Sequence, residues 1–228
     1  TREADYWRAQ AANRLAAPNS STAALHAAEI KSSRQTAASK QARAGEAAFR
    51  VLYEELVEIN TTLSAGSCTD ASNAMKAHLT RAGYSDANLH VIVPPQFPRQ
   101  GNLVAHLRGT DPKAKPILLL AHIDVVEADR ADWERDPFTL VEEEGFFYAR
   151  GAADDKAMAG VVTGMLGGYK RKGYRPRRGL TMALTCGEET PNVFNGVKYL
   201  LENHRDLIDA QFALNEGGGG RYDAQTEV

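Results

Sequence analysis

Three short apolar runs in this chain each end in side chains that carry charge or can bind a metal ion. The runs occupy residues 117–121, 179–186 and 210–215. The side chains that follow them are, in chain order, His122 and Asp124, Glu188 and Glu189, and Glu216. Runs of this length, separated by segments with helical spacing, predict parallel strands joined by helices. Right-handed crossovers place the carboxyl ends of such strands along one edge of the sheet, so we expect these side chains to gather there.

The remaining segments complete an α/β pattern. Residues 156–172 are expected to form a helix with one buried face, marked by Met158, Val161, Val162, Met165 and Tyr169. Further helices are expected at 49–59, 69–83 and 193–203, strands at 88–93 and 102–107, and a hairpin at 140–148. The first two strands alternate between polar and apolar residues, whereas the strand at 117–121 is fully apolar. This order predicts a mixed sheet with a parallel core.

The first 45 residues differ in composition from the rest of the chain. They are rich in Ala, Ser, Gln, Lys and Arg, contain few large apolar residues, and are broken by PNSS. A segment without a wide apolar stripe has little to bury against a core. We therefore expect residues 1–45 to form a helical or disordered extension and residues 46–228 to form the folded domain.

Composition excludes several classes of partner. The net charge of −2 gives no reason to expect nucleic acid or an anionic membrane. No apolar run approaches the roughly 18–20 residues of a membrane span. The N-terminus has no export signal, which predicts a cytoplasmic protein, although a processed N-terminus would fit a periplasmic or secreted one equally well. Cys68 and Cys186 are too few for a disulfide framework; a buried thiol is favoured for Cys186, and a bridge between them stays open.

Each polar cluster, taken alone, has a structural explanation. His122 could be an exposed residue at a strand end, and the Asp154-Asp155 pair before the helix at 156 could cap it. Glu188 and Glu189 are harder to explain, because adjacent carboxylates repel and burying either without a cation is costly. Glu216 leads into four glycines, which either form a flexible loop or let the backbone approach a ligand.

Together the clusters indicate a metal centre. One imidazole and several carboxylates at successive strand ends suit Zn²⁺, with Mn²⁺ or Co²⁺ as alternatives. Asp124 is placed to hold the other nitrogen of a ligating His122. A carboxylate-bridged pair of metals also leaves a neighbouring glutamate available as a general base.

Four ordered motifs resemble a family of two-zinc exopeptidases. These are AHIDVVEADRADWERDPF, ARGAADDK, CGEET and NEGG, which are similar to GHxDVVP…W..DPF, GRGxxDxK, GEE and a following acidic position in that family. The family contains glutamate carboxypeptidase, aminoacylase, carnosine dipeptidase, acetylornithine deacetylase and succinyl-diaminopimelate desuccinylase. The resemblance runs from about residue 47 to residue 221. It implies a three-layer sandwich around a mixed, mainly parallel sheet.

The resemblance also implies a role for each site residue. His122 and Glu216 would ligate one zinc and Glu189 the second, with Asp154 bridging the two ions. Asp124 would orient His122, and Glu188 would be the general base. The Asp154–Asp155 peptide bond would be cis. The activity implied is hydrolysis of an amide bond in a small peptide or an N-acyl amino acid, with a homodimer as the full-length form.

Two parts of the resembled family have no counterpart in this sequence. One is an inserted lid or dimerisation domain, and the other is a histidine near the C-terminus that completes the second metal site. We therefore expect the chain to correspond to the first part of such an enzyme. Two alternatives stay open: an inactive fragment that acts as a metal-binding or assembly module, and a magnesium-dependent phosphoryl-transfer enzyme. The substrate's identity does not follow from the sequence.

Overall fold

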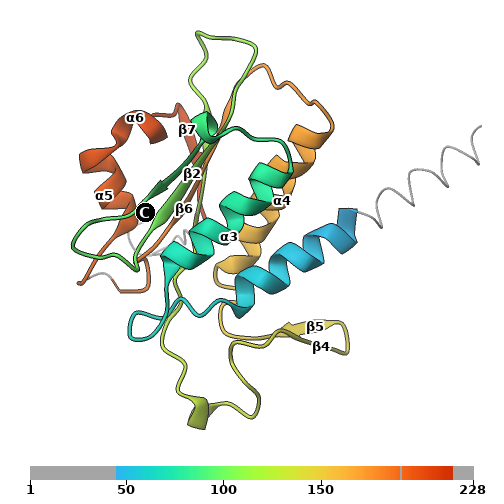
Figure 1. Ribbon diagram of the computed structural model, residues 1–228, viewed down its shortest axis with the longest axis vertical. Coiled ribbons are helices and arrows are strands. Elements are labelled where there is room, and N and C mark those ends of the chain that lie inside the picture. The colour runs from blue at the N-terminus through green and yellow to red at the C-terminus, as the bar shows by residue number, and fades with distance from the viewer. Residues whose placement is uncertain (1–44, 191, 218–228) are drawn as a thin grey trace, which may run out of the picture. The chain divides into compact units, whose positions relative to one another are not determined.

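A five-stranded sheet forms the centre of the computed structural model, which describes residues 45–190 and 192–217 (Figure 1). Residues 45–58 are helical and precede the labelled elements. The helices that follow are α3 (Cys68–Arg81), α4 (Lys156–Arg171), α5 (Gly196–Asn203) and α6 (Arg205–Ile208), with short 3₁₀ turns at Asp86–Asn88 and Arg130–Asp132. The strands are β1 (Leu89–Ile92), β2 (Asn102–Leu107), β3 (Ile117–His122), β4 (Val141–Glu143), β5 (Phe146–Tyr148), β6 (Leu180–Thr185) and β7 (Phe212–Leu214).

The central sheet is mixed, as the sequence predicts. Its strand order is β1-β2-β6-β3-β7, and β4 pairs with β5 in a separate hairpin. β1 pairs with β2, and β2 with β6, in antiparallel orientation, whereas β3 lies parallel to both β6 and β7. The pairings are thus divided evenly between the two orientations. The three parallel strands are the ones whose ends carry the polar clusters.

Alternate residues of each central strand face opposite layers of helices. On β2, Leu103 and Ala105 belong to a core that includes Leu79 of α3 and Leu166 of α4. Val104 instead packs in a second core with residues of α5 and α6. Figure 1 shows α3 and α4 on one side of the sheet and α5 and α6 on the other. This period of two confirms the three-layer sandwich.

Side-chain caps set where two helices begin. The hydroxyl of Ser67 accepts a hydrogen bond from the backbone N–H of Asp70 (3.1 Å), so α3 starts one residue before the predicted position. Asn195 accepts from the N–H of Lys198 (2.9 Å), which delays α5 to Gly196 instead of residue 193. Both residues are of the type preferred at helix N-termini.

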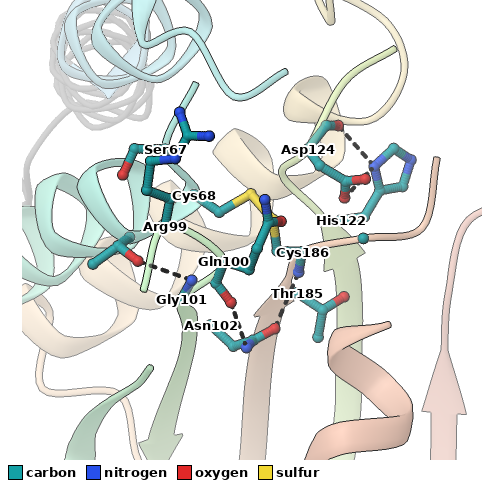
Figure 2. Close-up of a disulfide and its surroundings, with 12 residues drawn as sticks. Ser67, Cys68, Arg99, Gln100, Gly101, Asn102, His122, Asp124, Thr185 and Cys186 are labelled. Carbon is teal, nitrogen blue, oxygen red and sulfur yellow. Dashed lines mark hydrogen bonds and ion pairs between the residues drawn. A yellow bond between two sulfur atoms is a disulfide. The ribbon is translucent and has the colours of Figure 1, made fainter. Parts of the chain in front are cut away.

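Cys68 and Cys186 form a disulfide, so the favoured interpretation of Cys186 as a free thiol was wrong (Figure 2). Both residues are 1% exposed, and their Cα atoms lie 6.1 Å apart across 118 positions of sequence. That separation lies within the normal range for a disulfide. The pairing depends on how α3 and β6 meet in space, which residue patterns along the chain do not reveal.

The extension predicted at residues 1–45 lies, apart from its last residue, outside the described part of the chain, so the domain boundary stays a prediction. Among the helices that the structure describes, none is both long and apolar enough to cross a lipid bilayer.

Candidate metal centre

The parallel strands bring the predicted site residues to one edge of the sheet. His122 is the last residue of β3, and it lies opposite Thr185, the last residue of β6. Glu188 and Glu189 follow β6, and Glu216 follows β7 on the other side of β3. Because β3 lies between these two neighbours, its final side chain meets both acidic turns.

The ring of His122 is the centre of the cluster. Its Nε2 lies 2.9 Å from Asp154 Oδ1, 3.7 Å from Glu216 Oε1 and 3.9 Å from Glu188 Oε2. The imidazole is 3% exposed, whereas the side chains of Asp154 and Glu188 are 69% and 56% exposed. The cluster therefore has a buried floor and carboxylates that face solvent.

Two sets of three residues have ligand atoms close enough to hold a metal ion. In each set, one donor atom per residue lies within 4.8 Å of the others. One set is His122, Asp154 and Glu216, which the resemblance assigns to the first metal. The other is His122, Glu188 and Glu189. The resemblance expects Asp154 and Glu189 to share the second metal. Among the described residues, Asp154 belongs to the first set and Glu189 to the other.

Asp124 fixes both His122 and the turn that carries Glu188 and Glu189. The Nδ1 of His122 lies 3.0 Å from the backbone oxygen of Asp124 and 3.5 Å from its Oδ1 (Figure 2). The other carboxylate oxygen, Oδ2, accepts the backbone N–H of Glu189 at 3.0 Å. The main-chain carbonyl thus holds the ring more closely than the carboxylate expected for that role. An Nδ1–H donated to this carbonyl leaves Nε2 as the ligating atom.

The charges and pKa values of the cluster favour a bound cation. Burial lowers the pKa of His122, but hydrogen bonding and charge from Asp124, with a hydrogen bond from Asp154, outweigh it and raise the pKa to about 10. Burial, together with the charge of Asp154, raises the pKa of Glu189. In the metal-free protein a protonated imidazole thus supplies the positive charge that the carboxylates need. A set of one imidazole and several carboxylates is also the donor chemistry of zinc sites, so the residues present fit a divalent ion.

The Asp154–Asp155 peptide bond is cis, as the resemblance implies. Asp155 is 4% exposed, and its Oδ2 accepts the backbone N–H of His122 at 3.3 Å. Burial raises its pKa to about 6, with the charges of Glu216 and Asp154 adding to the effect and that of His122 opposing it. Its side chain makes no capping hydrogen bond to α4. The alternative explanation of this acidic pair as a simple helix cap therefore fails.

Lys156 is a site-supporting residue that sequence reasoning missed. It is completely buried, and its Nζ donates to the backbone oxygens of Ile59 (2.7 Å) and Val57 (3.3 Å). Burial lowers the pKa of Lys156 to about 7. Its hydrogen bonds satisfy carbonyls at the C-terminal end of the helix at 45–58 that have no partner within that helix. Lys156 thereby fixes the start of α4, directly after Asp154 and Asp155. The sequence feature that could have identified Lys156 is its place at the end of the ARGAADDK motif.

Comparisons with known proteins find matches among peptidases and enzymes that act on N-acyl amino acids. Residues 118–227 match the model of Peptidase family M20/M25/M40. The chain is 40% identical over 111 residues to N-fatty-acyl-amino acid synthase/hydrolase PM20D1 of Mus musculus, covering 49% of this chain and 22% of that protein. It is 33% identical over 120 residues to Aminoacylase-1B of Rattus norvegicus, covering 52% and 29%. The chain thus spans between about a fifth and a third of the length of these curated relatives.

Solved structures share the fold. Human carnosine dipeptidase 1 superposes with a TM-score of 0.57 at 21% identity, over 76% of this chain and 41% of that one. The M20 family metallo-carboxypeptidase Sso-CP2 from Sulfolobus solfataricus gives 0.60 at 22% identity, over 75% and 37%. At such identities the likeness establishes the α/β architecture.

Proposed function

We propose that this chain, whose residues 118–227 belong to peptidase family M20/M25/M40, supplies the metal-binding residues of a metal-dependent hydrolase. The bond it cleaves is the amide of a small peptide or an N-acyl amino acid. The observation that carries this proposal is the convergence of three carboxylates within 4 Å of the buried Nε2 of His122. The names of the relatives, an N-fatty-acyl-amino acid synthase/hydrolase and an aminoacylase, support the amide class.

The metal proposed is a pair of zinc ions. His122, Asp154 and Glu216 hold the first, while Asp154 and Glu189 contribute to the second. Zinc bound there supplies Lewis-acid polarisation of the substrate carbonyl and lowers the pKa of a water molecule. Asp124 and Asp155 orient His122 by contacts to its ring and to its backbone. The imidazole ligand is thus positioned before any ion arrives.

Glu188 is the proposed general base. Its carboxylate faces the cluster but is more than half exposed, whereas the backbone of Glu189 is fixed by Asp124. A carboxylate in this position accepts a proton from the attacking water and passes it to the departing nitrogen as the carbon–nitrogen bond breaks. The products are a free carboxylic acid and a free amine.

We also propose an oxidising compartment as the place where the protein works. The motivating observation is the buried disulfide, a bond that is rare in proteins of the reducing cytosol. Of the two locations left open by the sequence, this proposal favours a periplasmic or secreted protein over a cytoplasmic one. Alkylation of protein from unreduced cells, followed by intact mass measurement, tests it: two blocked thiols per chain would contradict the proposal.

Activity assays separate this function from its alternatives. Protein loaded with zinc is incubated with a panel of dipeptides and N-acyl amino acids, and free amine is measured. We expect amide cleavage by the wild type and none by Glu188→Gln. Phosphate release from an aryl phosphate with Mg²⁺, in the absence of amide cleavage, would instead support the phosphoryl-transfer alternative. Bound zinc with no turnover of either class would support the inactive metal-binding module.

A further inference from the structure

We infer that the Cys68–Cys186 disulfide is a positioning element of the metal centre. It holds the turn that carries Glu188 and Glu189 against the segment that follows His122, and its loss weakens metal binding while the fold persists. The inference rests on the proposed metal-binding function. Its basis is the place of the two cysteines in the contact network around the cluster.

Cys186 is the last fixed point before the acidic turn. Its backbone N–H donates to Asn102 Oδ1 (3.0 Å), and its carbonyl accepts the N–H of Gly196 (2.7 Å). The next residue, Gly187, has a φ of +85°, and a Cβ there would lie 2.2 Å from the backbone oxygen of Phe194. The turn therefore leaves β6 in one direction, and Glu188 begins two residues after the sulfur bridge.

Cys68 is tied to the other side of the site by the loop at residues 59–67. The backbone N–H of Val125 donates to Thr61 in that loop (3.4 Å). Ser64 donates through both its backbone N–H and its hydroxyl to the carboxylate of Glu127, at 2.9 Å and 2.7 Å. The loop thus contacts the segment at 124–127, and it ends at Ser67, next to the cysteine.

The disulfide closes a ring of contacts around the cluster. The ring runs from Cys68 through the loop at 59–67 to the segment at 124–127, and then by the hydrogen bond from Glu189 N–H to Asp124 back to the turn and Cys186. Figure 2 shows the bridge near His122 and Asp124. The ring's other links are hydrogen bonds between turns and loops, which open more readily than a covalent bond. Without the bridge, only hydrogen bonds hold the acidic turn against the His122 segment: the β3–β6 ladder up to Thr185, with the N–H of Ile123 donating to the Thr185 oxygen (2.8 Å), and the bond from the N–H of Glu189 to Asp124.

The fold itself has other sources of stability. One large apolar core packs α3 and α4 on one face of the sheet, and a second packs α5 and α6 on the other. Cys68 and Cys186 are two members of the larger core, beside many apolar side chains. We therefore expect its removal to affect the metal centre more than it affects the fold.

The test compares zinc affinity with thermal stability in matched variants. The double variant Cys68→Ala/Cys186→Ala removes the bridge and leaves no thiols to bind zinc. Ile208→Ala is the control, because Ile208 is buried in the second core, on α6 and outside the ring of contacts. Zinc dissociation constants are measured by competition with a chelator, and melting is followed by circular dichroism. We expect the double variant to bind zinc about 10- to 100-fold more weakly, as for loss of residues that support metal ligands. Ile208→Ala should melt earlier yet bind zinc like the wild type.

A second measurement covers the case in which the double variant does not fold. Wild-type protein is reduced with a phosphine and titrated with Mn²⁺, which has little preference for thiols. Folded protein with unchanged affinity in either experiment would overturn the inference. Unfolding of both the double variant and the reduced protein would also overturn it, because the bridge would then be a staple of the whole fold. Oxidised wild-type protein that binds no metal would instead refute the proposed function, and the inference with it.

Discussion

The proton on His122 gives the most specific prediction for metal binding. In the metal-free protein the pKa of this residue is about 10, so its ring is protonated at neutral pH. The Nε2 proton points to Asp154 Oδ1 at 2.9 Å, and this nitrogen is the one that a metal must use. Binding of the metal held by His122 therefore displaces one proton, and the apparent dissociation constant of that metal should rise about tenfold for each pH unit below that pKa.

Metal affinity measured between about pH 7 and about pH 8.5 distinguishes a His122 with a raised pKa from one with the usual histidine pKa. A histidine with a pKa near 6.5 is neutral across that window and gives a flat affinity. Asp155, with a pKa of about 6, has already lost its proton there. The same shift makes protonated His122 stabilise the metal-free fold. That contribution is complete below about pH 6.5 and is lost as the pH rises toward 10.

Calorimetric titration with Mn²⁺ tests the prediction. Repeating the titration in two buffers of different ionisation enthalpy counts the protons released, and we expect about one for the metal that His122 ligates. The control is His78→Gln, because His78 lies on α3, outside the cluster, and pairs with Glu55 of the helix at 45–58. This variant should keep the wild-type slope. A constant affinity with no proton release between about pH 7 and about pH 8.5 would refute the assignment of His122 as a metal ligand that is protonated in the metal-free protein.

Three further predictions concern single residues. Glu188→Ala should abolish hydrolysis and leave metal content intact, as measured by plasma mass spectrometry; loss of metal would mean that base and ligand are misassigned. Asp154→Ala should lower the metal content at both positions, and retention of two full equivalents would contradict a bridging role. Leu103→Ala should lower the free energy of unfolding in urea by about 2–5 kcal/mol, since this side chain is fully buried in the larger core. Val51→Ala, at a position 62% exposed, should change it by less than about 0.5 kcal/mol.

Strands with a clear period were the most predictable elements. The range predicted for β2, residues 102–107, matches the structure because alternate residues face two different apolar cores. The predicted runs at 117–121 and 179–186 agree with β3 and β6 to within one residue at each end, because buried parallel strands are apolar on both faces. The place of β7 beside β3, however, depends on the crossover after β6, which the pattern of residues does not specify.

Site residues were predictable where they follow a strand, and less so where they act through packing. His122, Glu188 and Glu216 were found because each follows an apolar run. Lys156 was missed because its charge suggests exposure, whereas carbonyls at the end of a distant helix satisfy it in the interior. The pairing of Cys186 with Cys68 could only be left open, since Cys68 approaches Cys186 only after α3 packs on the sheet. The chemical roles came from the resemblance and stay predictions.

Zinc binding by the purified 228-residue protein tests the central claim most directly. The protein is stripped of metal, reconstituted with zinc and analysed for metal per chain, beside the variant His122→Ala. The account predicts one tightly bound zinc, held by His122, Asp154 and Glu216, a second that binds more weakly, and loss of the tight one in the variant. A wild-type chain that binds no zinc, or a variant that binds as much, would contradict it.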